Sequence, residues 1–499
     1  MTTSLKLPSL LLQLQKQLAD TSDVYLVGGA VRDALLGKAS HDLDFVVNGD
    51  SLAIARRLAN QLNGAYYTMD EDFMVGRVVL DKESEQRTVL DFVAMQGDSL
   101  DEDLSKRDFT VNAMALSLND LTTVIDPLGG GADLLKGQLQ FCSPTAFADD
   151  PVRVMRALRI AASYQLSIHP KTRDALKQAV HLLPTVSIER LRDELFKLLD
   201  APRPSANLRV MDLLGISDHL LPETGEMKAV TQSAPHIYGV WEHAVHTVSK
   251  LEDVLRLLDK NYQHDNEGGG DIFSGVLSLR LGRYRDRISE HFNRQLNPDR
   301  SISALLFFAG LYHDITKPRH RSVEEDGRIR FIGHEQSGAQ VTRQRAEALR
   351  LSTQEAQRIE TVVAGHMRPW QLAKTGELPT KRAVYRFWRA VGEAGVDICL
   401  LSIADLLAIY GHTLPQPVLE HHIDVVRTLL EAYWEKPEEV KPQAFLNGDD
   451  LLEMFELRPG PVIGDLLESL WEAQAVGEVE DKTQAVEFIR KKIRELPEE

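Results

Sequence analysis

The stretch Leu26-Val-Gly-Gly-Ala-Val-Arg-Asp-Ala-Leu-Leu-Gly37, followed by His41-Asp-Leu-Asp44, decides the fold of this chain. An apolar run, a glycine pair and a helical pattern predict a strand that turns directly into a helix. Such a turn lets the backbone approach a phosphate, which the N–H groups of the helix N-terminus and Arg32 can receive. We therefore expect a phosphate-binding turn at Gly28 and Gly29.

Two carboxylates follow this turn. Asp42 and Asp44 are two residues apart in a strand-like segment, so both side chains lie on one face of the strand. Their mutual repulsion is costly unless a cation offsets it. Mg²⁺ prefers carboxylate oxygens and substrate phosphates, and two such ions can stabilise the attacking and leaving oxygens of a nucleotidyl transfer. The neighbouring glycine turn favours this chemistry over the alternative, a loop or helix cap.

The patterning predicts a mixed α/β region over residues 1 to about 135 and a helical chain after it. Pro151 suits a first helical turn and Asp149 or Asp150 its cap, so a helix is expected from there to about Tyr164. The predicted strands are 24–27, 43–47, 76–80 and 87–93. The clearest breaks are the glycine-rich segment 264–271 and the segment 435–442.

Composition excludes several classes of protein. The 499 residues are 43% hydrophobic, which is typical of a soluble folded chain and not of a disordered or fibrous one. No apolar run reaches the length of a membrane span and no signal peptide is evident, so we expect a cytoplasmic protein without membrane contact. Cys142 and Cys399 are too few for a disulfide framework.

The formal charge of −17 is unevenly distributed. Residues 151–210 carry +6 and residues 274–350 carry +5, so the rest of the chain is strongly acidic. A basic stretch in an acidic chain suits a restricted nucleic-acid track, and solvated helix faces are an equally good interpretation.

Five blocks resemble class II polymerase-β-like nucleotidyltransferases, the group of bacterial CCA-adding tRNA nucleotidyltransferases and poly(A) polymerases. They are residues 26–44, 107–115, 125–133, 149–159 and 188–195, and the resemblance is close over roughly residues 20 to 230. It implies an α/β polymerase-β-like nucleotidyltransferase head followed by an all-α neck, HD and tail region. The expected domains are a head over 1–137, a nucleotide-selecting neck over 138–230, an HD domain over 231–434 with an insertion around 264–300, and a tRNA-supporting tail over 435–499.

The resemblance also implies roles for single residues. Asp42 and Asp44 would hold Mg²⁺, and Asp91 is the candidate third catalytic carboxylate, with an exposed strand carboxylate as the alternative. Asp150 and Arg153, three apart on the neck helix, would read the base edge. The expected nucleotide-binding residues are Gly28, Gly29, Arg32, Arg107, Asp108, Asn112, Asp150, Arg153, Arg156 and Arg159. Glu189, Arg190 and Glu194 would brace them, and Asp149 stands where the family usually has Glu.

A second constellation lies further along the chain. Histidine, His-Asp and Asp segments on packed helices can supply imidazole and carboxylate ligands to a divalent metal. Their context resembles an HD domain, a metal-dependent phosphohydrolase fold. The implied ligands are His243, His313, Asp314 and Asp405, with His334 and His366 as extra ligands of a dinuclear form. His236 and His246 compete with His243 for the first position, and Lys317 could meet a phosphate.

We therefore expect a tRNA nucleotidyltransferase that adds CCA from CTP and ATP, with Mg²⁺ at the head and a divalent transition metal of unspecified identity at the HD centre. Phosphate contacts would come from the basic neck and the arginines of 280–300. An A-adding enzyme, a CC-adding enzyme and a poly(A) polymerase share the motifs. The alternative of another class is an HD phosphohydrolase whose head only binds nucleotide. The sequence does not specify the oligomeric state.

Overall fold

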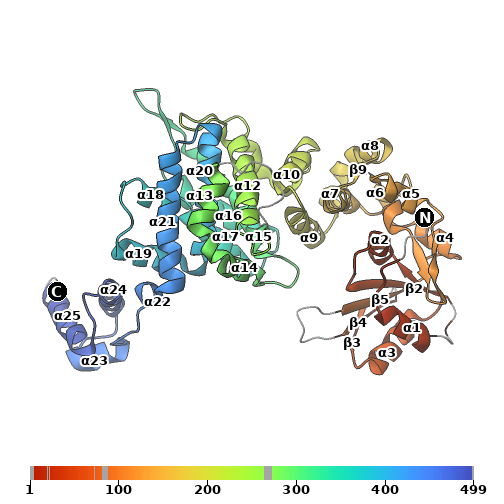
Figure 1. Ribbon diagram of the computed structural model, residues 1–499, viewed down its shortest axis with the longest axis horizontal. Coiled ribbons are helices and arrows are strands. Elements are labelled where there is room, and N and C mark those ends of the chain that lie inside the picture. Colours follow the sequence, from red (N-terminus) through yellow and green to blue (C-terminus); the bar gives the residue numbers. More distant parts are fainter. Residues whose placement is uncertain are drawn as a thin grey trace. The chain divides into compact units, whose positions relative to one another are not determined.

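The computed structural model describes residues 5–18, 21, 23–71, 74–80, 88–262 and 272–496. The chain divides into two compact units, Met1–Glu194 and Leu195–Glu499, with the division inside helix α9 (Ile188–Leu199). The first unit contains the large sheet and the second is almost entirely helical (Figure 1). The predicted glycine-rich break at 264–271 lies outside the described residues.

The first unit is built on a seven-stranded mixed sheet of order β3-β4-β5-β2-β1-β6-β7. Strands β2 and β5 pair in parallel and the other neighbours are antiparallel. The strands are β1 (Val24–Val27), β2 (Asp42–Val47), β3 (Ala65–Asp70), β4 (Val75–Leu80), β5 (Thr88–Ala94), β6 (Ala115–Ser117) and β7 (Asp120–Ile125). The predicted α/β head followed by helices is confirmed, and all four predicted strands are present. Strands β3, β6 and β7 were missed. At least half of the residues of β3 and β7 are exposed and lack apolar alternation, and β6 is only three residues long.

One face of this sheet carries the core of the unit. Leu43, Phe45 and Val47 of β2 are buried, and Phe45 stacks on Phe92 of β5 with ring centroids 4.7 Å apart. The core side is packed by helices α1 (Leu10–Gln17), α2 (Gly29–Leu35) and α3 (Ser51–Gln61). Because side chains alternate along a strand, Asp42 and Asp44 are held on the opposite face.

The rest of the first unit is mostly helical. It comprises α4 (Leu100–Ser105), α5 (Gly130–Leu135), α6 (Ala146–Asp149), α7 (Arg153–Tyr164), α8 (Pro170–Ala179) and the short parallel pair β8 (Gln138–Leu139) and β9 (Ser167–Ile168). Helix α7 ends at Tyr164, as predicted, but begins only at Arg153. Asp150 has extended backbone angles outside α7, and its Oδ1 accepts a 3.4 Å hydrogen bond from the Val152 N–H.

The second unit packs its helices around α20 (Gly395–Tyr410), which is buried along nearly its whole length. Its other principal helices are α10 (Pro204–Leu213), α12 (Val240–Leu257), α13 (Ile272–Leu281), α14 (Arg285–Asn293), α15 (Ile302–Tyr312), α16 (His334–Ala348), α17 (Thr353–Gly365), α18 (Arg368–Ala373), α19 (Lys381–Val391) and α21 (Gln416–Glu435). The segment Lys381–Thr413 is long and apolar enough to cross a membrane, but 89% of its most apolar window is buried inside this unit. That burial favours a core helix of a soluble protein.

The last helices form a small lobe with its own hydrophobic core. They are α22 (Pro437–Val440), α23 (Gly448–Phe455), α24 (Pro461–Val476) and α25 (Lys482–Arg494), and the change from α21 to α22 confirms the predicted break at 435–442. Arg386 of α19 donates two 2.8 Å hydrogen bonds to Glu472 of α24. The acidic lobe is thus attached to the rest of the second unit through ion pairs.

Gly130 allows α5 to pack closely against the backbone of Thr110. A Cβ atom at Gly130 would lie 2.0 Å from the Thr110 carbonyl oxygen, which no side-chain rotation can relieve. We expect Gly130→Ala to lower the free energy of unfolding of the first unit by about 1 to 3 kcal/mol, seen as a lower calorimetric transition temperature.

The matched control is Gly131→Ala, whose Cβ would meet two side-chain ends and no backbone, Asp126 Oδ2 at 3.3 Å and Met114 Sδ at 3.9 Å. It gains helix propensity and should leave the transition unchanged or slightly raised. Equal effects of the two substitutions would contradict this packing argument.

Candidate active site and metal centre

Three carboxylates share one face of the sheet. Asp44 of β2 lies directly opposite Asp91 of β5, and Asp42 lies two residues before Asp44 on the same strand. Desolvation by the surrounding chain raises the pKa of Asp44 to about 6, and the charges of Asp91 and Asp42 add to this effect. The charge of Arg107 opposes it. The Asp44 side chain nevertheless keeps contact with solvent. A carboxylate whose pKa is raised by neighbouring carboxylates belongs to a donor set suited to Mg²⁺.

The glycine turn lies beside these carboxylates. Gly28 precedes α2 with a positive φ of 76°, a conformation that favours glycine. A Cβ there would lie 3.5 Å from both Asp44 Oδ2 and Arg107 Nη1. The structure therefore brings together the predicted turn, a predicted metal carboxylate and a predicted nucleotide-binding guanidinium. Gly29 is the first residue of α2, where its N–H is free of intrahelical partners.

Arg32 lies inside the unit rather than on its surface. Its guanidinium donates to Asp33 Oδ1 at 3.0 Å and to Asn112 Oδ1 at 2.5 Å, and it also contacts the Tyr164 hydroxyl. The guanidinium carbon lies 3.8 Å from the centroid of the Tyr164 ring. Tyr164 was not predicted as a site residue, because nothing in the sequence shows that the end of α7 reaches α2.

A polar network continues from Asn112 into the neck helices. Asn112 donates to Asp108 Oδ1 at 3.2 Å, and Arg156 Nη2 lies 3.1 Å from Asp108 Oδ2. Glu194 accepts a 2.6 Å hydrogen bond from Arg159, and its other oxygen lies 3.9 Å from Arg156 Nε. Four predicted nucleotide-binding residues are thus connected to one another, and Glu194 occupies the bracing position expected for it.

The predicted base-reading pair is placed differently from the prediction. Asp150 lies before α7, so the expectation that it shares one helix face with Arg153 is wrong. Asp150 Oδ2 accepts a 2.7 Å hydrogen bond from Arg190. Arg153 donates to the carbonyl oxygens of Ala146, at 3.1 Å, and Lys106, at 2.8 Å. Asp150 has the extended backbone favoured before a proline, which places it outside α7 and separates the two side chains onto different elements.

The second unit contains two groups of buried ligand side chains. Among the described residues, one is His243, His313 and Asp405, and the other is Asp314, His334 and His366. The first group is linked by distances of 3.3 Å between His243 Nε2 and His313 Nε2 and 2.9 Å between His243 Nε2 and Asp405 Oδ1. Asp314 connects the groups, with one oxygen 3.2 Å from His313 Nε2 and the other 3.2 Å from His334 Nε2.

Backbone carbonyl groups set the orientation of three of these histidines. The Nδ1 atoms of His313, His334 and His366 each lie 2.7 Å from the carbonyl oxygen three residues earlier. Since a carbonyl only accepts, Nδ1 carries the proton and Nε2 is aimed into the cluster. Within the described part of the chain the buried Nε2 of His366 has no hydrogen-bond partner. This orphaned acceptor and the donor set fit divalent metal ligation.

The charges inside the cluster act in opposite directions on two of its histidines. Burial, followed by repulsion from His313, lowers the pKa of His366 to about 3. Burial also disfavours a charged His313, but Asp314 and Asp405 outweigh it and raise the pKa of His313 to about 10. A divalent ion that binds His313 must displace that proton, as metals do at such sites.

The competing histidines remain outside the two groups. His246 is half-buried on α12 and stacks on Tyr238 with ring centroids 4.1 Å apart. The ring of His236 lies 5.3 Å from that of His243, and burial followed by the charge of Lys317 lowers the pKa of His236 to about 3. Lys317 itself donates to Gln232 and lies 2.6 Å from Asp314 Oδ2.

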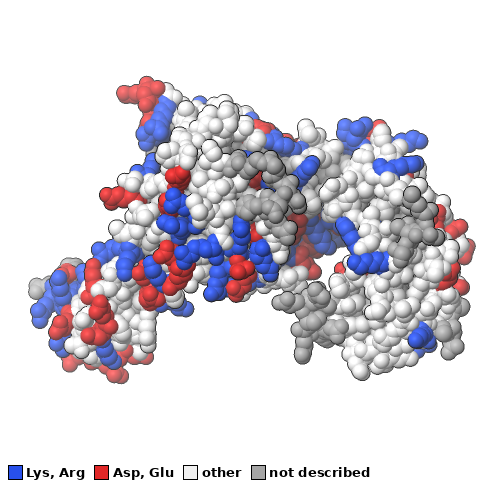
Figure 2. Space-filling model, viewed as in Figure 1, with Lys and Arg blue, Asp and Glu red and all other residues white. Residues whose placement is uncertain are grey.

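The arginines of 280–300 are engaged within their own unit. Arg300 forms a buried pair with Glu355 at 2.7 Å, and Arg280 lies 3.0 Å from Asp424. Arg283, Arg287 and Arg294 pair with Glu435, Glu290 and Glu393, and Arg285 donates to the Leu257 carbonyl. Figure 2 shows cationic and anionic side chains interleaved over this unit. This stretch therefore offers less uncompensated charge for RNA than its arginine count suggested.

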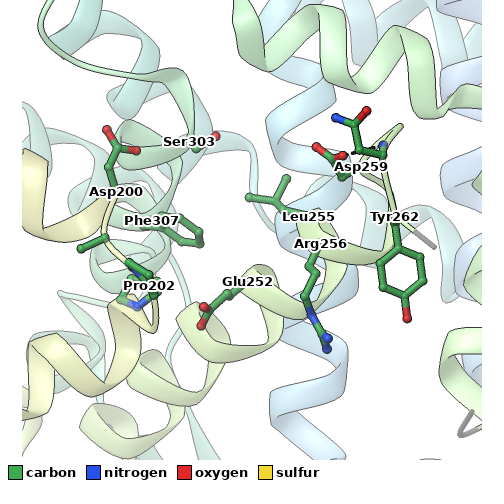
Figure 3. A pocket seen from close by; sticks show the side chains of 12 residues that line it. Asp200, Pro202, Glu252, Leu255, Arg256, Asp259, Tyr262, Ser303 and Phe307 are labelled. Atoms are coloured by element: carbon green, nitrogen blue, oxygen red, sulfur yellow. Dashed lines mark hydrogen bonds between the residues drawn. The ribbon is translucent and has the colours of Figure 1, made fainter. Parts of the chain in front are cut away.

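A cavity of about 540 Å³ lies elsewhere in the second unit (Figure 3). Its lining combines apolar side chains such as Phe307 and Leu255 with Glu252, Arg256 and Asp200. None of the residues predicted for catalysis, nucleotide binding or metal ligation lines it, so we exclude it from the candidate sites.

We expect both groups of the second unit to retain metal. His334→Ala with His366→Ala removes two ligands of the second group and leaves all three ligands of the first. The divalent metal retained after desalting should therefore fall to about half. Elemental analysis measures this content. His246→Ala is the matched control on α12 and should retain the full amount, whereas an unchanged content in the double variant would contradict a two-metal cluster.

Comparison with known proteins agrees with this organisation. Residues 24–140 match the poly A polymerase head domain, residues 165–227 the probable RNA and SrmB-binding site of polymerase A, and residues 278–409 the HD domain. An A-adding tRNA nucleotidyltransferase of Deinococcus radiodurans is 32% identical over 95% of this chain and 96% of its own length. A CC-adding enzyme of Thermus thermophilus is 29% identical over 94% and 93% of the two chains.

A solved structure has the same fold. The Thermotoga maritima CCA-adding enzyme, complexed with tRNA, aligns over 98% of this chain and 97% of its own, with a TM-score of 0.57 and 22% identity. Full-length similarity, the three matched domains and the carboxylate face agree with one another. The chain belongs to the bacterial tRNA nucleotidyltransferase family, in the branch whose poly(A) polymerase-type head is followed by an HD domain.

Proposed function

We propose that this protein completes the CCA end of tRNA by transferring nucleotides from CTP and ATP to the 3′-hydroxyl. The observation that carries the proposal is the position of Asp42, Asp44 and Asp91 on one sheet face beside the Gly28 turn. Membership of the tRNA nucleotidyltransferase family supports the substrate class. We propose a cytoplasmic location on the same basis.

The reaction needs charge neutralisation and alignment more than covalent chemistry. Divalent ions at this site supply Lewis-acid stabilisation of the reacting oxygens. Asp42 and Asp44 hold those ions, and Asp91 orients the terminal hydroxyl. Gly28 and the free N–H groups at the start of α2 receive the triphosphate.

Arg107 lies next to the same turn and pairs with Asp103 at 3.1 Å. The Arg107 side chain is 24% exposed, so it can exchange this carboxylate for a phosphate. Arg32, by contrast, has its donors engaged inside the unit, and we propose that it supports the floor of the phosphate site and contacts the nucleotide through its remaining N–H groups. Asp108, Asn112, Arg156 and Arg159 hold that floor in place.

Base selection requires a change of partners. Asp150 and Arg153 can present an acceptor and donors to the edges of cytosine and adenine once they leave Arg190 and the carbonyls of Ala146 and Lys106. We propose that incoming nucleotide causes this exchange, so that the protein rather than a template selects the base.

Adenosine addition alone is the second candidate for the head. A relative with 32% identity over 95% of this chain is named for A addition, and the enzymes with 27% and 29% identity over nearly the whole chain are named for CC addition. Full-length similarity to enzymes that add only A or only CC is the observation that supports this second candidate.

The HD centre supports a further activity, metal-dependent hydrolysis of a phosphate ester. Six buried ligand residues and Lys317 converge there, which an ordinary structural core does not require. We propose a phosphate at a damaged tRNA end, including a 2′,3′-cyclic phosphate, as its substrate. The metal would be a transition ion such as Ni²⁺, Mn²⁺, Fe²⁺ or Co²⁺.

Incorporation of labelled CTP and ATP, separately and together, tests the head. With tRNA transcripts that end before CCA, after CC and after CCA, we expect C, C and A to be added in order, followed by arrest. Addition of A only to the CC end would establish the second candidate, and long A runs would indicate poly(A) synthesis. Absence of incorporation into every transcript would contradict nucleotidyl transfer.

The two centres should be separable by mutation. Asp42→Ala with Asp44→Ala should reduce incorporation about a thousandfold or more, because two metal ligands are lost, and should leave any phosphatase activity intact. His313→Ala with Asp314→Ala should abolish any phosphatase activity and leave nucleotide incorporation intact. Nucleotide addition by the head double variant would contradict the assigned mechanism.

A further inference from the structure

A fourth charged residue completes the carboxylate face. Strand β4 pairs with β5 so that Arg77 lies directly opposite Asp91, and β5 pairs with β2 so that Asp91 lies directly opposite Asp44. Residues directly opposite one another on paired strands project to the same face. Arg77, Asp91 and Asp44 therefore form a row across three adjacent strands, β4, β5 and β2 (Figure 1).

The contact between Arg77 and Asp91 has forked geometry. Arg77 Nε donates to Asp91 Oδ1 and Arg77 Nη2 donates to Asp91 Oδ2, both at 2.8 Å. Two parallel bonds fix the plane of a carboxylate, which a single bond does not. The Arg77 side chain is 38% exposed, so this pair adds little to the stability of the fold. Its main physical effect is on the orientation and charge of Asp91.

Arg77 also interacts with the other two carboxylates. Its pKa is raised first by the hydrogen bond to Asp91 and further by the charges of Asp91, Asp42 and Asp44. Arg77 is thus a resident cation that partly offsets three anionic groups before any metal binds. A fixed positive charge near a metal site weakens cation binding by Coulomb repulsion.

We propose that Arg77 is a positioning residue for nucleotidyl transfer, which holds Asp91 in the orientation required at the 3′-hydroxyl and limits the affinity of the carboxylate face for divalent cations. The inference rests on the proposed function of the head for its kinetic part. Its cation-binding part depends only on the carboxylate row. The two parts predict opposite changes when Arg77 is removed.

A Mn²⁺ titration followed by electron paramagnetic resonance measures the affinity of the carboxylate row for a divalent cation, and so tests the effect of the Arg77 charge. The full chain is used with His313→Ala and Asp314→Ala in every sample, so that the second unit contributes less background. Arg77→Ala should bind Mn²⁺ about three- to tenfold more tightly, because a neighbouring cation is lost. Arg77→Lys keeps the charge and should match the parent protein. Weaker or unchanged Mn²⁺ binding by Arg77→Ala would overturn the charge assignment.

Steady-state kinetics of nucleotide incorporation, with wild-type HD residues, tests whether Arg77 positions Asp91. Arg77→Ala and Arg77→Lys both lose the paired hydrogen bonds to Asp91. Both should lower kcat about 10- to 100-fold and change KM for nucleotide less than about threefold. In an Asp91→Asn background, Arg77→Ala should cause no further loss. Equal loss in both backgrounds, or a full rate with Arg77→Lys, would overturn the positioning role.

Arg56→Ala is the matched control. Arg56 is an exposed arginine of the same unit whose guanidinium lies 5.0 Å from the centroid of the Tyr66 ring. It should change neither kcat nor Mn²⁺ affinity. If the wild-type chain adds no nucleotide, the proposed function fails, and the Mn²⁺ titration still decides whether Arg77 sets the charge of the carboxylate row.

Discussion

Repulsion between carboxylates on one face of a sheet is the constraint on which the head depends. The period-two geometry of β2 places Leu43, Phe45 and Val47 in the core, and the same geometry leaves Asp42 and Asp44 side by side on the other face. Parallel pairing with β5 then adds Asp91. The fold tolerates this arrangement because Arg77 and Arg107 lie beside it and because divalent cations can bind there. The proposed phosphate-binding turn at Gly28 lies beside these carboxylates because β1 pairs with β2.

The second unit also gathers charged and polar side chains, but its histidines and aspartates are buried. Backbone carbonyls hold three of its imidazoles in one tautomer, so their Nε2 atoms converge on the carboxylates of the cluster. Asp314 lies between both ligand groups, which makes it the residue that connects two metal positions. A cluster of this kind is costly to bury unless ions satisfy it. The two units therefore present two chemically different candidate metal environments, an open carboxylate face and an enclosed cluster of histidines and aspartates.

Sequence reasoning succeeded where local pattern determines structure. Alternation predicted β2 and the glycine pair predicted the turn before α2. The resemblance to an HD domain implied the six candidate ligands that meet in the second unit. Sequence reasoning failed where a distant partner decides the outcome. Arg77 and Tyr164 became site residues through strand pairing and helix packing, and the arginines of 280–300 were compensated by carboxylates up to 152 residues away. Asp150 and Arg153 were separated by the backbone break at Pro151, which spacing on an ideal helix does not anticipate.

The most direct measurement uses the two diastereomers of the α-thio analogue of an incorporated nucleotide, with Mg²⁺ or Mn²⁺. Sulfur replaces one non-bridging oxygen of the α-phosphate, and the softer Mn²⁺ accepts sulfur more readily than Mg²⁺. If transfer occurs on the metal-binding carboxylate row, one diastereomer should be incorporated with Mg²⁺ and the other should be recovered, at least in part, only with Mn²⁺. Equal use of both diastereomers with Mg²⁺ would contradict metal contact at the α-phosphate and with it the assignment of this face as the catalytic site.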